Sequence, residues 1–272
     1  MRIYIQTDIE GIAGWCFFDN PKDQSIENYK HRERMRKLLT AEVNAAVSAC
    51  YDAGADDVIV HDNHGSGYNI FFEDLDSRCR IVHGKTWSSN AWMPKLDISV
   101  DRLILIGMHA MCGTEGAVCP HSKVDINNGQ MFLSEATAVA ACAGDCDVPL
   151  IFASGDDKTI AEILEKISGI EYVITKEALS PYMACSIMPA MARELIYAGV
   201  KKGIQLPPPP PFKIPGPVTV GIIDSEGHVP PFARIGEPVT LPTFIEAMTE
   251  SERRMPWTCL DTKYPDGYVY PS

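Results

Sequence analysis

Residues 101–110 read DRLILIGMHA, in which an unbroken apolar run, 103–108, is followed by the polar residue His109. A strand of a parallel sheet is buried on both faces, so it is apolar along its whole length. Residues 148–157, VPLIFASGDD, repeat the pattern of an apolar run with a polar exit. The two segments predict strands of a buried parallel sheet.

The surrounding sequence alternates between predicted strands and predicted helices. Further strands are expected at 2–7, within 57–65 (DVIVHDNHG, ending in a polar loop) and at 79–84, and helices at 27–53, 134–144 and 157–167. Such alternation is typical of an α/β fold with a doubly wound, mostly parallel sheet and helices on both faces. Residues 123–133, KVDINNGQMFL, instead predict a hairpin, because Asn-Gly is the strongest short hairpin signal.

The character of the chain changes after about residue 175. A helix is expected at 187–203, followed by the stiff, extended proline run Pro207–Pro211. A strand at 215–224 and a helix at 242–255 come next. We therefore predict two domains: residues 1–175 as the α/β metal-binding catalytic domain, and 176–272 as a smaller α+β domain serving oligomerisation and substrate access.

Composition excludes several classes of protein. The chain has 24 basic and 36 acidic side chains, a net charge of -12, and lacks the basic footprint of a nucleic-acid binder. It has no apolar stretch of about 18 residues, so no membrane span is expected. The beginning, MRIYIQTDIEG, reads as a strand and not as a signal peptide. Nine cysteines without a CxxC pair indicate free thiols, and hence a cytoplasmic protein.

Acidic and imidazole side chains recur where the predicted strands end. The first strand is followed by Asp8 and Glu10, the second by His64, and the LILIG strand by His109. In a doubly wound sheet, ligands bind outside the carboxyl ends of the strands. We therefore expect these side chains to meet at one edge of the sheet, together with Glu135 at the start of a helix.

Each of these residues has a simpler interpretation when taken alone. An Asp-x-Glu pair is often a turn or helix cap, and an acid at a helix start favours the helix dipole. Together, however, three carboxylates and two imidazoles suit two Zn²⁺, Mn²⁺ or Co²⁺ ions if one carboxylate bridges them. Metal–ligand bonds near 2 Å and a metal spacing of about 4 Å would place the five groups within about 8 Å of a common centre.

His121 lies in the long loop between His109 and the predicted hairpin. Long loops in compact domains are often functional, and an imidazole there could move protons near neutral pH. The alternative is a histidine that only orders the loop.

The motifs TDIEGIAG, HDNHG, IGMHA, PHS, SEA and GDD follow one another in this chain. Their order resembles that of the metal-dependent D-aminopeptidases of the dipeptide-transport type, over roughly residues 1–200. The resemblance implies two zinc ions per chain in a ring-shaped, self-compartmentalised homo-oligomer, a decamer being one ring size. It assigns the metal ligands to Asp8 (bridging), Glu10, His64, His109 and Glu135, and makes His121 catalytic.

These observations predict a zinc-dependent metallo-aminopeptidase or amidohydrolase. Its substrates would be short peptides or amides, with D-amino acids among them, cleaved by a hydroxide bound between two metals. One alternative is a haloacid-dehalogenase-like phosphatase, which would use an aspartate nucleophile and leave the histidines idle. The other is a non-catalytic, oligomeric metal-binding protein.

Overall fold

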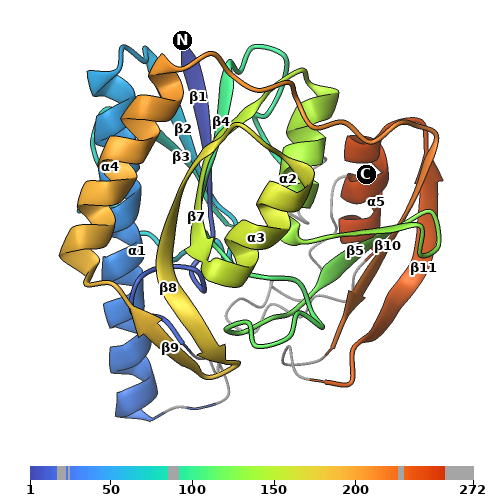
Figure 1. Ribbon diagram of the computed structural model, residues 1–272, viewed down its shortest axis with the longest axis horizontal. Helices are drawn as coiled ribbons and strands as arrows, with labels where there is room; N and C mark the ends of the chain where they lie inside the picture. Colours follow the sequence, from blue (N-terminus) through green and yellow to red (C-terminus); the bar gives the residue numbers. More distant parts are fainter. Residues whose placement is uncertain (17–22, 24, 85–91, 226–229, 255–272) are drawn as a thin grey trace, which may run out of the picture.

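The computed structural model describes residues 1–16, 23, 25–84, 92–225 and 230–254 (Figure 1). Its main element is a 7-stranded sheet in the order β3-β2-β1-β4-β7-β8-β9, in which only β9 runs antiparallel to its neighbour. The strands are β1 (Arg2–Thr7), β2 (Asp57–Asp62), β3 (Arg80–Val82), β4 (Arg102–Met108), β7 (Leu150–Asp156), β8 (Glu171–Ser180) and β9 (Met183–Ser186).

Helices cover both faces of this sheet. On one face, α1 (Ile26–Asp52) and α4 (Pro189–Gln205) pack against each other and share a core with β1, β2 and β7. On the other face, α2 (Glu135–Asp145) and α3 (Asp157–Lys166) enclose a second core with β4. The predicted doubly wound, mostly parallel sheet is confirmed, and its central apolar strands are buried as their sequence requires.

A smaller antiparallel sheet lies beyond α2 on the second face (Figure 1). Its order is β11-β10-β5-β6, and the helix α5 (Phe244–Arg253) packs against β10, β11 and α2. The strands are β11 (Ala233–Leu241), β10 (Val218–Asp224), β5 (Lys123–Ile126) and β6 (Met131–Leu133). The predicted Asn-Gly hairpin is present as β5 and β6, with Asn127, Asn128 and Gly129 at positive φ in its turn.

A division of the chain at residue 175 does not match these two sheets. Residue 175 falls inside β8, so the large sheet continues to residue 186. Conversely, β5 and β6 belong to the smaller sheet, because β5 pairs with β10. The smaller unit is therefore assembled from two stretches of chain. The pairing of β5 with β10 is non-local and leaves no signal in either segment, so the sequence does not predict it.

Two further expectations concern side chains and membranes. None of the helices in the described residues is both long and apolar enough to cross a membrane. The eight cysteines within the described part of the chain are free thiols, as expected, and Cys259 lies outside it. The described residues end at 254, so 255–272 of the predicted second domain also lie outside.

The segment after the proline run packs tightly on the end of α2. A Cβ atom added at Gly144 would lie 1.8 Å from the carbonyl oxygen of Phe212, and Lys213 Nζ binds Asp147 Oδ1 at 2.5 Å. Only a glycine allows the two backbones to approach so closely. This contact holds in place the segment of chain that leads from α4 to the smaller sheet.

We expect Gly144→Ala to destabilise the protein by about 2–3 kcal/mol, because the added methyl group collides with backbone. Helix propensity acts in the opposite direction, since alanine in a helix interior is favoured over glycine by up to about 1 kcal/mol. Urea unfolding of the two proteins measures the difference. An increase in stability would show that the close contact does not exist.

Candidate metal centre

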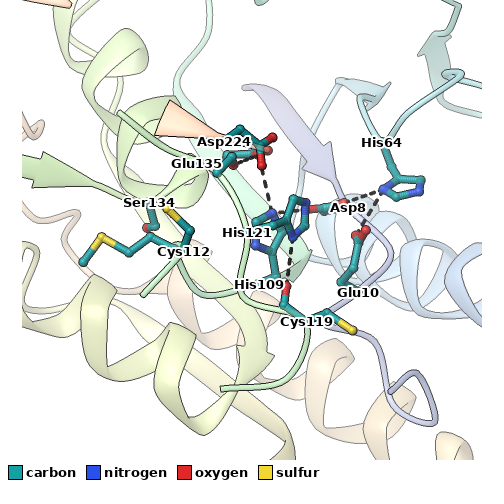
Figure 2. A network of polar contacts seen from close by, with 12 residues as sticks. Asp8, Glu10, His64, His109, Cys112, Cys119, His121, Ser134, Glu135 and Asp224 are labelled. Atoms are coloured by element: carbon teal, nitrogen blue, oxygen red, sulfur yellow. Dashed lines mark hydrogen bonds and ion pairs between the residues drawn. The ribbon is translucent and has the colours of Figure 1, made fainter. Parts of the chain in front are cut away.

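The predicted site residues meet at the carboxyl end of the large sheet, facing the smaller sheet (Figure 2). Asp8 follows β1, His64 follows β2 and His109 follows β4. Glu135 is the first residue of α2, whose N-cap is Ser134, and His121 lies just before β5. Elements far apart in sequence therefore place all six predicted side chains in one small volume.

The first group of side chains is Asp8, Glu10 and His64. His64 Nδ1 lies 3.1 Å from Asp8 Oδ1 and 3.1 Å from Glu10 Oε2. One ligand atom from each residue lies within 4.8 Å of those of the other two. Two carboxylates and one imidazole thus point at a common centre.

The second group is His109, His121 and Glu135, whose ligand atoms also lie within 4.8 Å of one another. His109 Nε2 is 3.5 Å from Glu135 Oε1 and 3.4 Å from Asp8 Oδ2. Asp8 therefore belongs to both groups: one carboxylate oxygen faces His64 and the other faces His109. This is the arrangement expected of a bridging carboxylate.

Backbone carbonyls fix the orientation of two imidazoles. His109 Nδ1 donates to Ala110 O at 2.8 Å, and His121 Nδ1 donates to Cys119 O at 2.8 Å. Because a carbonyl can only accept, both rings carry their proton on Nδ1, and Nε2 is the basic nitrogen. The rings stack with centroids 3.7 Å apart and an interplanar angle of 15°. A hydrogen bond from the second nitrogen is the usual support of a metal-binding histidine.

The dimensions of the site fit metal ions. With metal–ligand bonds of 2.0–2.1 Å, two ligands of a tetrahedral ion are about 3.3 Å apart. The spacings between ligand atoms, 3.1 to 3.5 Å, match this value. In addition, His109 Nε2 is buried without a hydrogen-bond partner in the described structure. A buried polar atom of this kind calls for a ligand.

The electrostatics of the six side chains are tightly linked. Burial opposes ionisation of Asp8, yet the hydrogen bond from His64 and the charge of His109 lower the pKa of this carboxyl group. Burial and the charge of Asp8 raise the pKa of Glu10. Burial disfavours the charged form of His109, but Glu135 and Asp8 outweigh it, and the pKa is raised well above its usual value. The carboxylates thus attract positive charge strongly.

The His64 loop is fastened by a buried carboxylate. Asp62, the last residue of β2, accepts hydrogen bonds from the backbone of Asn69 and Ile70 and from the Asn69 amide. The same amide donates to the carbonyl oxygen of His64 at 2.6 Å. Asp62 therefore closes the turn that points His64 at the site.

The His121 loop is held by α3. Asp156 caps this helix, accepting from Thr159 N at 2.7 Å, and also accepts from Val118 N at 3.3 Å. Glu162 accepts from Met111 N at 3.2 Å and from the Thr114 hydroxyl. The predicted strand exit at Asp156 and Asp157 thus supports the site without joining it.

The loop that carries Asp8 and Glu10 lies directly on the strand ends. A Cβ atom at Gly11 would be 2.0 Å from the carbonyl oxygen of Met108, so this crossing requires glycine. Glu42, buried in α1, accepts from Ala13 N at 2.9 Å. Burial raises the pKa of Glu42 to about 7.

Three residues around the site were not among the predicted ones. Asp224 ends β10, is buried, and lies on the Glu135 side of the site in Figure 2. It follows a predicted strand, so the rule of strand exits could have found it. Glu42 and Lys176 are buried charged residues inside a helix and a strand. Nothing in the local sequence distinguishes them from solvent-facing charges.

Comparison with known proteins identifies the family of the chain. The model of the D-aminopeptidase family (peptidase M55) matches residues 1–229. The D-aminopeptidase of Bacillus subtilis (strain 168) is 27% identical over 206 residues, which cover 72% of this chain and 71% of the relative. The family match spans well over half of the sequence, so the chain belongs to the D-aminopeptidase family, a family of peptidases.

A solved structure shows the same fold. It is described as the Zn-dependent D-aminopeptidase DppA from Bacillus subtilis, a self-compartmentalizing protease. The two folds superpose with a TM-score of 0.79 at 24% identity, and the match covers 95% of this chain and 100% of the other. The α/β sheet with its added antiparallel sheet is therefore the architecture of a known peptidase.

The buried carboxyl group of Glu42 makes stability depend on pH. Its pKa is about 7 in the folded protein and near 4.5 when exposed, so folding favours the protonated form. The favourable contribution of Glu42 to the free energy of unfolding is fully present below pH 4.5 and is lost as the pH rises through 7. Glu42→Gln keeps the oxygen that accepts from Ala13 and removes the titration. We expect the free energy of unfolding of the wild type to fall by about 3 kcal/mol relative to that of this variant between pH 4.5 and 8.

Urea unfolding in chelator at several pH values measures this difference, with Glu165→Gln as a control at an exposed glutamate. A difference between wild type and Glu42→Gln that stays constant from pH 4.5 to 8 would show that Glu42 does not titrate in this range.

Proposed function

We propose that the chain is a zinc-dependent aminopeptidase that removes the first residue of short peptides at a site for two metal ions. One observation carries the proposal: the two oxygens of Asp8 face different imidazoles, His64 and His109. A carboxylate with both oxygens engaged on opposite sides is suited to hold two cations at once. Membership of the D-aminopeptidase family agrees with this activity.

Asp8, Glu10 and His64 would hold one ion, and Asp8, His109 and Glu135 the other. Oxygen and imidazole nitrogen are ligands that suit Zn²⁺, with Mn²⁺ or Co²⁺ as alternatives. Ser122 donates to Glu135 and thereby orients its carboxylate. The structural relative from Bacillus subtilis is Zn-dependent, which supports zinc here.

Two ions bound in this way would lower the pKa of a shared water towards about 7 and polarise the substrate carbonyl. His121 would then hold and deliver a proton. Its ring lies flat against His109, and its Nδ1 is fixed by Cys119, so Nε2 is the nitrogen that exchanges protons. From this position His121 would protonate the leaving amine or stabilise the oxyanion as an imidazolium.

Short peptides with a D-amino acid at the amino end are the proposed substrates, and small amides are the alternative. The D-preference rests on the names of the family and of the Bacillus subtilis relative. A phosphatase of the haloacid-dehalogenase type would leave the histidines unused. In this structure His64 and His109 both contact Asp8, which favours metal-assisted hydrolysis.

We expect Asp8→Asn and His121→Ala to damage the enzyme differently. The Asp8 variant should lose both metal ions and activity, because a shared ligand supports both ions. His121→Ala should retain both ions and lose turnover by about 10²–10⁴-fold, the usual contribution of an acid–base group. Metal content by mass spectrometry and kcat on D-Ala-D-Ala and L-Ala-L-Ala measure the two effects.

His83→Ala is the matched control, because His83 is exposed and lies against Tyr68 and Phe72 outside the site. Loss of metal in His121→Ala would make His121 a ligand instead. Wild-type turnover in that variant would leave the histidine with a structural role only. Metal without turnover in the wild type would favour the non-catalytic alternative.

The chain is also proposed to form a ring-shaped homo-oligomer. Apolar side chains on the segment from the end of β8 to the middle of α4 are exposed, including three methionines. These residues, called here the hairpin–helix patch, are Leu179, Tyr182, Met183, Met188, Met191 and Leu195. Contiguous exposed apolar surface often marks an interface. The self-compartmentalizing relative makes a second copy of the chain the proposed partner.

We expect the double variant Met188→Glu with Met191→Glu to fall to the mass of one chain, 30.0 kDa. At the proposed interface, the two introduced carboxylates would be buried against an apolar surface without a hydrogen bond or an opposite charge to compensate them. Light scattering at micromolar concentration measures the mass. Ile98→Glu is the matched control, because Ile98 is 86% exposed but lies outside the hairpin–helix patch. An unchanged mass in the double variant would exclude this patch as the interface.

A further inference from the structure

Lys176 is a buried lysine close to the metal centre. It lies in β8 and is only 1% exposed, and no other lysine or arginine of the described residues is buried. Lysines almost never bury their charge unless it is paired. Burial lowers the pKa of Lys176 to about 8. The location of this ammonium group therefore requires an explanation.

Backbone carbonyls provide the partners of Lys176. Its Nζ donates to the carbonyl oxygens of Ile12 at 2.9 Å, Trp15 at 2.7 Å and Glu10. An ammonium group has three protons, so these bonds use all of its donors. All three acceptors belong to the loop that follows β1, and one of them is the carbonyl of a predicted metal ligand.

The topology makes this contact unusual. β8 is not a neighbour of β1, because β4 and β7 lie between them. The loop at residues 8–15 therefore crosses the ends of two strands before it reaches Lys176. The preceding residue, Thr175, adds a bond from its hydroxyl to Gly11 O at 2.5 Å. Two successive side chains of β8 thus tie down one loop that starts on β1.

The ammonium group also lies among buried carboxylates. The charges of Asp156, Glu42 and Glu10 all favour its protonated form. Lys176 is thus placed to restrain the loop and to offset part of its negative charge.

We propose that Lys176 is a positioning residue of the metal centre. By holding the carbonyls of Glu10, Ile12 and Trp15, it fixes the path of the loop so that the Asp8 and Glu10 carboxylates meet His64. Its Nζ donates to backbone carbonyls and not to the side-chain atoms proposed as metal ligands. The inference rests on the proposed function only in that the site binds metal, because the fastening of the loop follows from the hydrogen bonds of Lys176 themselves.

Three variants test this role. Lys176→Met removes the ammonium group at similar volume, and Thr175→Val removes only the hydroxyl that binds Gly11. Ile163→Ala is the matched control, because this buried residue of α3 belongs to the core on the other face of the sheet, and its truncation lowers stability without changing charge. Zinc affinity is measured by competition with a chromophoric chelator. Hydrogen exchange of residues 8–15 is measured in metal-free protein.

In Lys176→Met we expect zinc affinity to fall by about 10–100-fold, the range for groups that orient metal ligands. The rise in Tm on adding zinc should shrink accordingly. The amides of Gly11 and Ala13, bonded to Gly107 O and Glu42, should exchange faster without metal. Ile163→Ala should lose stability yet keep its zinc affinity and its protection in this loop.

Wild-type zinc affinity together with wild-type exchange in Lys176→Met would overturn the inference. So would an equal loss of affinity in Ile163→Ala, because the effect would then follow stability alone. If Lys176→Met does not fold, the zinc affinity and the hydrogen exchange of Thr175→Val test the fastening of the loop instead. We expect a smaller loss of zinc affinity in this variant. A wild-type protein that binds no zinc would refute the proposed function, whereas the exchange measurement would still test how the loop is held.

Discussion

The burial of the Asp8 carboxylate between two imidazoles is the interaction on which the rest of the site depends. Asp8 is 5% exposed, and Glu10 beside it is 2% exposed. Removing such charges from water is costly unless opposite charges or hydrogen bonds compensate. His64 and His109 provide part of the compensation, which is why the pKa of Asp8 is lowered despite burial. Divalent ions bound at this centre would complete the compensation of the buried negative charge, and they would displace the extra imidazole protons.

This constraint explains why the surrounding loops are so firmly held. The proposed ligands follow β1, β2 and β4 in loops, which alone would be mobile. Each loop is therefore secured by a buried or half-buried polar side chain of a neighbouring strand or helix. Asp62 holds the His64 turn, Glu162 holds the His121 loop, and Lys176 holds the loop of Asp8 and Glu10. The large sheet sets the distances, and these contacts set the orientations.

The sequence predicts the sheet and the meeting of the ligands because both follow from local patterns. Apolar runs such as LILIG identify buried parallel strands, and the carboxyl ends of those strands lie at one edge. What escaped prediction depends on distant pairing. The strand β8 alternates between exposed and buried residues, so Lys176 reads as one more polar residue although it is buried. Likewise, nothing in the Asn128-Gly129 hairpin identifies β10 as the partner of β5, the pairing that brings Asp224 to the site.

The stacked pair of His109 and His121 shows how one geometry can support two roles. Both rings have Nδ1 fixed by a carbonyl, so both direct Nε2 as the basic nitrogen. They differ in what faces Nε2 and in how the backbone is held. His109 follows directly on β4, and its Nε2 lies between Asp8 and Glu135, which suits a rigid ligand. His121 sits on a loop whose position depends on α3. A loop held in this way keeps the His121 ring stacked on His109 at the proposed metal centre, where proton transfer would require it.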